Sequence, residues 1–448
     1  MTRVRRRTRS ARRGAGRPRT SLGSLADIRA LPPFVRLLAA TQLAFNIGFF
    51  AVLPYLAEHL GGALGMGGWL VGLVLGLRTF SQQGLFVVGG ALTDRYGPRP
   101  VVLAGCVLRI AGFLWLGYAQ QTASVIAAVL CVGFAAALFS PAVESETARQ
   151  AVRHEQATGH PRARTLAVFS ASGQAGAFLG PLLGSLLLLA DFRTATFAGA
   201  LVFVAVLAGH WHWMPRGRPE PAAGDVRGAA TSAHRSAAPP RRSDGALRAT
   251  VRNGPFLLLC LAYSTYLLAY NQLYLALPEE VVRATGSQGA LGWLFALSSL
   301  LVVCAQLPVT RAVGERMSHR AALCAGLAVV AAGFLTVAAL APFGLTGAAG
   351  LVPAAVYVLA LTFGQMLAVP AARALVTELV AEERLGFSMG ALSSAAGAVV
   401  LGGSAATGAL IGAGLGPAAV WSALVCVPVL GVAAGRAVRV RDAAGRAC

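Results

Sequence analysis

Long apolar stretches separated by short polar segments run through almost the whole chain. An α-helix needs about 20 apolar residues to cross roughly 30 Å of hydrocarbon, and twelve stretches of that kind can be placed in the sequence. They begin near Phe34, Gly68, Arg99, Ser124, Ala163, Thr194, Pro255, Gly289, Arg320, Leu351, Gly386 and Pro417. The pattern predicts an all-α polytopic membrane protein, and an even number of spans places both termini on one side of the membrane.

Basic residues mark one side of this predicted topology. Arginines are dense before the first span, after the last span, in the loop between the sixth and seventh spans and in alternate short loops. The opposite loops carry only Arg193 and Arg283. Because loops rich in arginine remain on the inner side of a membrane, we expect both termini and the middle loop to be cytoplasmic and the protein to lie in the plasma membrane.

Composition supports a membrane protein and argues against a nucleic-acid-binding one. Of the 448 residues, 56% are hydrophobic and 12% are charged, and a mean hydropathy of +0.66 is more than the surface of a soluble domain tolerates. The net charge of +21 comes from segments that flank spans and carry no interleaved aromatic residues. We therefore expect these segments to meet anionic membrane lipid, with no nucleic acid as a partner.

The residues of common enzymatic chemistry are absent or badly placed for it. All 38 basic residues are arginines, which excludes a Walker ATPase motif and a Schiff-base lysine. The seven histidines fall in loops or near span ends, and the seven cysteines show no metal-ligand spacing. We expect no enzyme, no metal and no other cofactor.

A composition shift divides the chain into two bundles. Residues 215–253 are rich in Pro, Ala, Ser and Arg and poor in large apolar residues, which predicts a flexible cytoplasmic linker. The predicted parts are a disordered basic arm over 1–33, an N-terminal six-helix bundle over 34–214, the linker over 215–253, a C-terminal six-helix bundle over 254–436 and a cytoplasmic tail over 437–448.

An internal repeat favours two pseudo-symmetric bundles. A shift of 224 residues aligns Leu53-Pro54 with Leu277-Pro278, and Gly68-Trp69-Leu70 with Gly292-Trp293-Leu294. Several matches at one offset, with two prolines and two tryptophans among them, indicate duplication. Parallel six-helix repeats are a transporter architecture with the substrate site between the halves.

A charged motif that favours a turn follows the second apolar stretch. Its key residues are Gly90, Asp94, Arg95, Gly97 and Arg99. The motif resembles the loop signature between the second and third helices of the major facilitator superfamily, except that Pro98 replaces one basic residue. We expect Gly90 to allow close helix contact, Asp94 to accept from backbone N–H groups of the next helix, and Gly97 to permit the turn. Its charges are predicted to gate the halves; the alternative is a loop that only sets topology.

A glycine motif in the fifth span points to the same family. Its residues are Gly176, Gly180, Pro181 and Gly184. They resemble the antiporter motif of the superfamily, although Ala167 and Ser185 stand where that motif has glycines. The alternative is ordinary packing of small residues, because glycines four positions apart let two helices approach closely.

The resemblance covers nearly the whole chain and is closest to the twelve-helix drug:proton antiporters. The runs Gly76 to Gly84 and Arg109 to Phe113 look like one multidrug-efflux branch. This implies a monomer that exports amphiphilic or drug-like small molecules, and so confers antibiotic resistance, in exchange for protons by alternating access. Val129 stands where many proton antiporters carry an arginine, and no Asp or Glu lies mid-span. The alternatives are an importer or symporter of a small, possibly anionic metabolite and a sensor built on a transporter fold.

Polar residues within the spans are candidates for a substrate cavity, since they are costly in lipid. The candidates are Gln42, Asn46, Arg78, Gln82, Tyr263, Tyr266, Tyr270 and Asn271. Arg78 and Gln82 share a helix face and either bind a polar or anionic group or have a structural role. The tyrosines form one stripe, which either faces a cavity for flat aromatic substrates or packs against other helices. Arg109 is expected to be structural.

Two charges form a candidate gate. Glu144 lies three residues after Pro141, and Arg373 lies three residues after Pro370. Pseudo-twofold symmetry predicts that they face each other across the cytoplasmic mouth and pair when it closes. The alternative is two independent charges at the level of the headgroups.

Overall fold

The computed structural model of the protein describes residues 31–159, 161–214, 253–380 and 384–438. All regular structure in these residues is helical, and twelve helices there are long and apolar enough to cross a membrane. The predicted all-α class with twelve spans is therefore confirmed. Apart from a few edge residues, the predicted basic arm over 1–33, the linker over 215–253 and the tail over 437–448 lie outside the described residues.

Six of the spans precede residue 215. Their helices are α2 (Pro33–Phe50), α4 (Gly68–Gln83) continued by α5 (Phe86–Tyr96), α6 (Pro98–Tyr118), α7 (Thr122–Thr158), α8 (Arg162–Leu187) and α9 (Phe192–Trp213). Short helical segments η1 (Leu53–Tyr55), α3 (Leu56–Glu58) and η2 (His59–Ala63) follow α2. We call these elements the first half.

The other six spans form the second half. Their helices are α12 (Gly254–Asn271) with α13 (Ala276–Thr285), α14 (Gly289–Arg316), α15 (His319–Leu340) with η3 (Ala341–Phe343), α16 (Gly347–Leu379), α17 (Leu385–Gly412) and α18 (Pro417–Ala437). The predicted start of each span agrees with the structure to within a few residues. The largest difference is at α16, which was expected near Leu351 and begins at Gly347.

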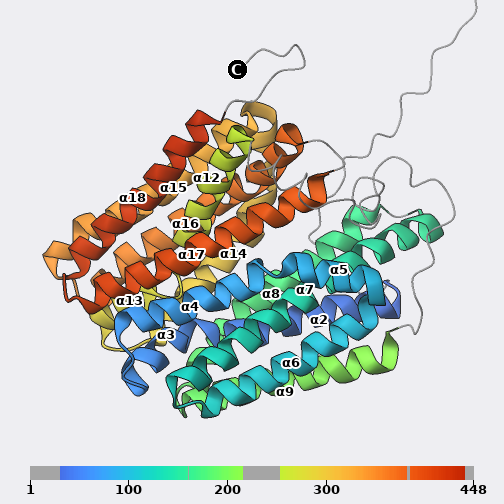
Figure 1. The fold of residues 1–448 in the computed structure, drawn as a ribbon, viewed down its shortest axis with the longest axis horizontal. Coiled ribbons are helices and arrows are strands. Elements are labelled where there is room, and N and C mark those ends of the chain that lie inside the picture. Colours follow the sequence, from blue (N-terminus) through green and yellow to red (C-terminus); the bar gives the residue numbers. More distant parts are fainter. Residues whose placement is uncertain (1–30, 160, 215–252, 381–383, 439–448) are drawn as a thin grey trace, which may run out of the picture.

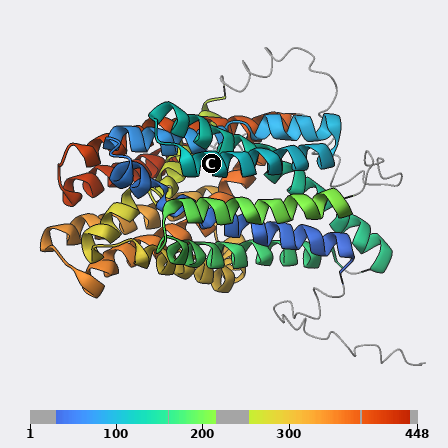
Figure 2. The ribbon, with the colours of Figure 1, turned by 90° about the horizontal axis from the view of Figure 1, so that it is seen from below.

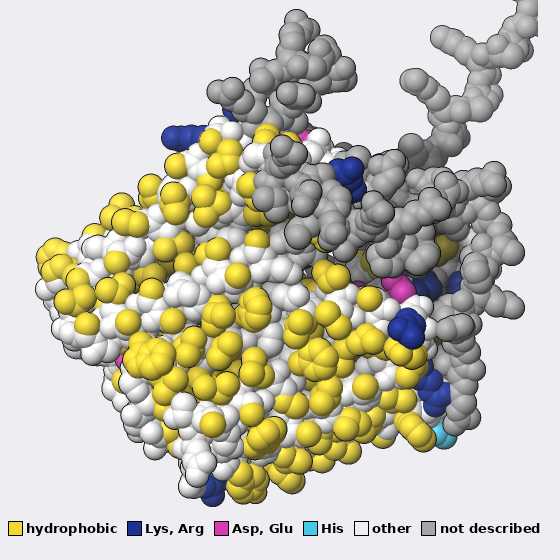
Figure 3. Space-filling model, in the orientation of Figure 1, with side chains coloured by type: hydrophobic (Ala, Val, Ile, Leu, Met, Phe, Trp, Pro, Cys, Tyr) yellow, Lys and Arg dark blue, Asp and Glu magenta, His cyan; other side chains and the backbone are white. Residues whose placement is uncertain are grey.

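All spans run along the long axis of the molecule and so define two ends. We call the end where α9 stops at Trp213 and α12 starts at Gly254 the linker end, and the opposite end, with residues 51–67 and 272–288, the far end. Figure 2 shows that α2 begins and α9 ends at the same end of the bundle. Between the ends, the side of the bundle is covered by apolar side chains (Figure 3), as expected for a surface that faces lipid.

The internal repeat corresponds to matching backbone features. Pro54 lies in η1 and Pro278 lies in α13, the short helical segments that follow the first long helix of each half. Trp69 and Trp293 occupy the first turns of α4 and α14 and are 56% and 70% exposed. Tryptophans at span ends are typical of a membrane interface.

The two halves are in close contact at the far end. The first turns of α4 lie against the last turns of α17, where a Cβ atom on Gly68 would stand 2.9 Å from the backbone nitrogen of Gly412. One on Gly76 would stand 2.8 Å from Cα of Leu401. Figure 1 shows α4 and α17 together near the far end on the left and diverging toward the linker end. Only glycines permit so close an approach of two backbones.

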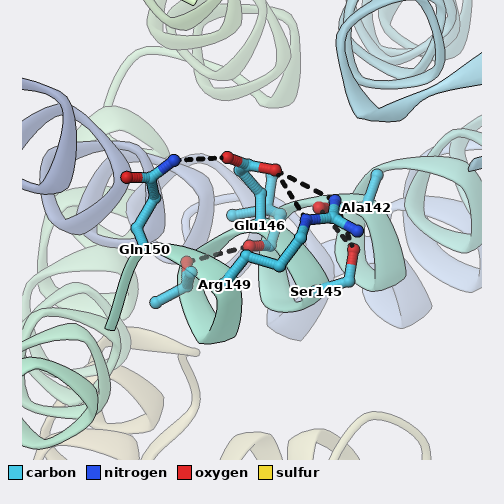
Figure 4. A network of polar contacts seen from close by, with 7 residues as sticks. Ala142, Ser145, Glu146, Arg149 and Gln150 are labelled. Carbon is cyan, nitrogen blue, oxygen red and sulfur yellow. Dashed lines mark hydrogen bonds and ion pairs between the residues drawn. The ribbon is translucent and has the colours of Figure 1, made fainter. Parts of the chain in front are cut away.

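The linker end carries a long extension of α7. The helix has 37 residues, and at 1.5 Å per residue it is much longer than the roughly 30 Å of hydrocarbon. Glu146, buried in this extension, accepts hydrogen bonds from Arg149 at 3.0 Å and Gln150 at 2.8 Å (Figure 4). These i, i+3 and i, i+4 contacts support the helix where it passes beyond the spans.

Candidate functional site

A cavity of about 250 Å³ lies between the two halves. The first half contributes residues of α2 and α8, and the second half contributes residues of α12, α14 and α16. Its polar lining residues are Gln42, Asn46, Ser170, Gln174, Tyr270, Ser298, Ser299 and Gln365. None of the residues that line it is an Asp, Glu, His or Arg, so the site binds through hydrogen bonds and apolar contacts.

Three amides in this lining are available to a ligand. The side chains of Gln42, Gln174 and Gln365 are half-buried, and no hydrogen bond joins them to any residue that the structure describes. In contrast, Asn46 donates to the backbone oxygen of Gln42 at 2.9 Å, and Ser298 is hydrogen-bonded to Thr362 at 2.7 Å. An amide both donates and accepts, so three unpaired amides can bind several polar groups of one molecule.

Aromatic rings close the cavity toward the far end. Phe50, the last residue of α2, lies 6.1 Å from Phe295 of α14 between ring centroids. Phe295 in turn stacks on Tyr274 at 5.9 Å. Toward the linker end the lining continues through Gln42 and Val302, and from Leu300 to Gly314 no described side chain of α14 is buried. The cavity is therefore closed at the far end and open toward the linker end.

The predicted cavity residues divide into two groups. Gln42, Asn46 and Tyr270 line the cavity. The remaining candidates, which do not line it, are Arg78, Gln82, Tyr263, Tyr266 and Asn271.

Arg78 is buried inside the first half, beside the cavity. Its guanidinium donates to Gln82 at 2.7 Å and to Thr79 at 3.5 Å. Its Cζ atom lies 4.6 Å from the ring centroid of Phe49 and 5.8 Å from that of Tyr274. Arg78 and Gln82 share a helix face, but the pair does not line the cavity. Nε of Arg78 has no hydrogen-bonding partner in the described part of the chain.

Arg109 of α6 also lies over the ring of Phe49 and is 1% exposed. Its Cζ atom is 5.0 to 5.3 Å from the ring centroids of Phe45, Phe49, Phe113 and Phe203. Its only hydrogen bond within the described residues is to the carbonyl of Val132, at 2.6 Å. The guanidinium is thus held mainly by cation–π contacts.

Asn271 joins the two halves. Its Oδ1 accepts a hydrogen bond from Thr79 of α4 at 2.9 Å, and its Nδ2 donates to Ser404 of α17 at 2.7 Å. All three side chains are buried. In the conformation observed, the side chain of Asn271 therefore links the two halves and does not line the cavity.

The tyrosine stripe of α12 is continuous and extends past the end of that helix to Tyr274. Tyr263, Tyr266, Tyr270 and Tyr274 have successive ring centroids 5.8, 6.2 and 6.0 Å apart. Tyr266 is 4% exposed and packed, while the hydroxyl groups of Tyr270 and Tyr274 lie 3.4 Å apart. One part of the stripe therefore packs between helices and Tyr270 reaches the cavity.

The candidate gate charges lie near one another toward the linker end. Glu144 of α7 and Arg373 of α16 are both exposed, and Arg373 acts electrostatically on Glu144. No direct ion pair joins them among the described residues. This separation agrees with a mouth that is open at the linker end.

The loop motif forms the turn between α5 and α6. Gly97 has a φ of +87°, a left-handed conformation that glycine accepts without strain. The expected close helix contact at Gly90 is wrong, because a Cβ atom there would meet nothing within 4 Å. Gly89 makes that contact instead, since its added Cβ would collide with the carbonyl of Ala137 on α7. Arg99 donates to the carbonyl of Trp211 at 2.8 Å.

The other charges of the motif are on the surface. Asp94 is exposed and accepts no hydrogen bond from the described residues, so the expected acceptance from the N-terminus of α6 is not observed. Arg95 lies over the ring of Tyr96, with 5.3 Å between Cζ and the centroid. In this conformation the motif is ordered by contacts within the first half.

The glycine motif of α8 packs against α2. A Cβ atom on Gly176 would stand 2.7 Å from Cβ of Asn46, and one on Gly180 would stand 2.8 Å from Cβ of Phe50. One on Gly184 would stand 2.6 Å from Cε2 of Tyr55. The carbonyl of Pro181 accepts a 2.6 Å hydrogen bond from the hydroxyl of Tyr55. The motif thus holds two cavity-lining helices together.

Sequence reasoning missed several lining residues, chiefly Gln174, Ser298, Ser299 and Gln365. Each is a polar residue inside an apolar span, the same signal that identified Gln42 and Asn46. Applying that criterion to every span, and not mainly to the first, second and seventh, would have found the two glutamines.

Twelve spans in two similar halves with a cavity between them define the class of membrane transporters. Residues 35–279 match the model of the Major Facilitator Superfamily. An uncharacterized MFS-type transporter of Mycobacterium tuberculosis is 35% identical over 425 residues, which cover 92% of this chain and 94% of the relative. The chain therefore belongs to the Major Facilitator Superfamily and is a membrane transporter, not an enzyme.

Other relatives agree with this family, and a solved structure shares the fold. The multidrug resistance protein MdtH of Aeromonas hydrophila is 29% identical, with 79% of this chain and 81% of the relative covered. MdtH of Salmonella typhi is 30% identical over 67% of this chain and 68% of its own length. The crystal structure of a peptide transporter POT in complex with sulfate matches with a TM-score of 0.70 at 16% identity, covering 93% of this chain and 97% of that one, and shows the same fold.

Proposed function

We propose that the protein exports amphiphilic or drug-like small molecules across the plasma membrane by alternating access, in exchange for protons. The cavity between the halves carries this proposal. It is closed at one end by Phe50 and Phe295 and lined by three amides that have no partner among the described residues. Such a cavity can take up a molecule from one side and hold it by hydrogen bonds and aromatic contacts.

The direction of transport is supported by two observations. Relatives at 29 to 30% identity are named multidrug resistance proteins. The glycine motif of α8, which resembles the antiporter motif, packs directly on α2 at the cavity wall. The proton component rests on the resemblance to drug:proton antiporters.

Charge asymmetry supports cytoplasmic termini. Described arginines of the linker-end loops and helix ends include Arg95, Arg99, Arg149, Arg153, Arg162, Arg164, Arg311, Arg316, Arg320 and Arg436, whereas the far-end loops carry Arg193 and Arg283. With the positive side inside, the linker end faces the cytoplasm and the observed cavity is open inward. An inward-open cavity is the state in which an exporter collects its substrate.

The test is transport by the purified protein in liposomes loaded with a fluorescent amphiphile. An imposed pH gradient should drive the amphiphile against its concentration gradient, and a protonophore should abolish the flux. A strain that lacks the gene should be more susceptible to part of a broad drug panel, and collapse of the proton gradient should remove that difference. Flux without dependence on the gradient would exclude proton exchange, and an unchanged susceptibility profile together with absent flux would exclude export.

The alternative of import or symport predicts a proton movement of the opposite direction relative to the cargo. An importer of an anionic metabolite would move cargo into the cytoplasmic compartment with protons moving in the same direction. Measuring the pH inside liposomes during transport separates the two, because antiport and symport change it in opposite directions for the same movement of cargo.

A further inference from the structure

The two buried arginines of the first half have no counter-ion. Arg78 is 6% exposed and Arg109 is 1% exposed, and neither contacts a carboxylate among the residues that the structure describes. Arg78 Nε and two nitrogens of Arg109, Nε and one terminal NH2, make no hydrogen bond there. Two positive charges therefore lie in the interior without neutralisation.

These charges are close to the cavity wall. Arg78 lies 5.8 Å from the ring of Tyr274, whose hydroxyl is 3.4 Å from that of Tyr270, a lining residue. Both guanidinium groups also lie over Phe49, at 4.6 and 5.3 Å. The ring of Phe49 is 5.0 Å from that of Phe50, a second lining residue. Only one or two aromatic side chains therefore separate each guanidinium group from the cavity.

No residue of the cavity lining offsets the electrostatic field of the two buried arginines. It contains no acidic residue, and the charges toward the mouth, Glu144 and Arg373, are opposite in sign and near each other. Charges inside a protein within a membrane are poorly screened by water and salt, so their field reaches neighbouring sites. The cavity therefore has a positive potential and hydrogen-bonding walls.

We infer that this cavity selects neutral and anionic compounds with several hydrogen-bonding groups and rejects lipophilic monocations. A cation in the cavity meets two unneutralised positive charges and no carboxylate. A neutral compound loses nothing to this field and gains the amides of Gln42, Gln174 and Gln365. An anion gains from the field as well. The inference rests on the proposed export function, for which it specifies the class of cargo.

The test uses three probes built on one planar aromatic skeleton that differ only in a neutral amide, a sulfonate or a trimethylammonium group. Binding of each to the purified full-length protein is measured by fluorescence titration. The amide and sulfonate probes should bind, and the ammonium probe should bind about tenfold more weakly or worse, since a tenfold difference needs only about 1.4 kcal/mol.

Substitutions at the arginines test the cause. Arg78→Gln removes the charge and keeps a hydrogen-bonding side chain, so it should reduce the difference in affinity between the sulfonate and ammonium probes. Arg78→Lys keeps the charge and should preserve that difference in affinity. Arg109→Gln gives a second variant if Arg78→Gln is not obtained folded. Arg193→Gln removes one exposed charge at the far end and should leave the ranking of the three probes unchanged.

Two outcomes overturn the inference. One is an ammonium probe that binds as well as the amide probe; the other is a ranking unaffected by removal of either buried charge. Liposome transport of the same probes separates this failure from that of the proposed function. Outward transport that prefers the ammonium probe would overturn the inferred selection by charge but would still agree with the proposed export. If no probe is transported in either direction, both the proposed export and the inference are overturned.

Discussion

Thr79 of α4 donates a 2.9 Å hydrogen bond to Asn271 of α12, so a buried hydroxyl links the two halves of the transporter. Asn271 is itself tied to Ser404 within the second half. In the alternating-access cycle that we propose, the far end opens, so we expect this bond to break once in each cycle.

Thr79→Val should weaken closure of the far end. A buried hydrogen bond contributes about 1 kcal/mol, so its loss should raise the population with an open far end about fivefold. Spin labels at Trp69 and Leu415, both exposed and on either side of the contact between α4 and α17, report this as a longer distance. Thr265→Val is the matched control, because Thr265 bonds within its own helix. An unchanged distance distribution in Thr79→Val would contradict the assignment.

Gly72→Val should block closure outright. Its added side chain would collide with the carbonyl of Ser404, a backbone atom that cannot move aside. We expect at least about a tenfold loss of transport, corresponding to 1.4 kcal/mol or more, with the spin labels held apart. Gly402→Val on α17 provides the control, since a Cβ atom at Gly402 meets nothing within 4 Å. Normal transport by Gly72→Val would show that close contact here is not needed.

Glu144 and Arg373 provide a test by charge exchange. They do not form an ion pair in the observed conformation, with the linker end open, and we expect them to pair when that end closes. Glu144→Arg and Arg373→Glu should each reduce transport about fivefold or more, because each places two like charges at the closing mouth. The double exchange should restore most of the activity. If it restores none, the two charges act independently.

Asp94→Asn should slow transport without weakening substrate binding. Asp94 is exposed and accepts no hydrogen bond from the described residues here, and we expect it to act in the conformation in which the linker end is closed. We expect the rate to fall several-fold while the probe dissociation constant changes by less than about twofold, under 0.5 kcal/mol. Asp94→Glu, which keeps the charge, should retain more of the rate. A large loss of affinity with normal cycling would argue against a gating role.

Arg109→Met should leave thermal stability nearly unchanged. The substitution removes the cation–π contacts with four phenylalanine rings and the bond to Val132, but it also removes a buried charge without a counter-ion. Replacing buried charges by apolar groups of similar size is often neutral. Arg109→Ala leaves a cavity between the rings and should cost about 2 to 4 kcal/mol. Unfolding of both variants in detergent, followed by fluorescence, decides whether the charge or the volume matters.

Hydropathy and motif spacing predicted the spans well because lipid imposes a simple length rule on each helix. The predicted and observed starts coincide at Gly68, Gly289 and Pro417, where glycine-rich segments or, before Gly289, the polar pair Ser287-Gln288 separate the apolar stretches. The turn at Gly97 was equally accessible, since few residues adopt its backbone conformation.

The rotation of each helix about its own axis was less predictable. Gly89 and not Gly90 contacts α7, and Arg78 faces Phe49 and Tyr274 instead of the cavity. In a membrane bundle both the lipid-facing and the buried sides of a helix are apolar, so the sequence shows little periodicity to orient it. Which residues of α14 and α16 line the cavity depends on this rotation and on how the two halves pack, so the sequence alone did not identify them.

The aromatic surroundings of Arg109 have a consequence for biogenesis. An arginine at the centre of a span costs about 2.5 to 3.5 kcal/mol during insertion, which opposes the mean hydropathy of 1.8 for this segment. Phe45 and Phe49 on α2 leave the ribosome before α6, Val132 follows on α7 and Phe203 comes last. The third span is thus expected to enter the membrane as a hairpin with the fourth, against a first span that is already in place. The guanidinium of Arg109 would then contact Phe45, Phe49 and Val132 before the sixth span is made. Phe203 of the sixth span would complete the surroundings of the charge.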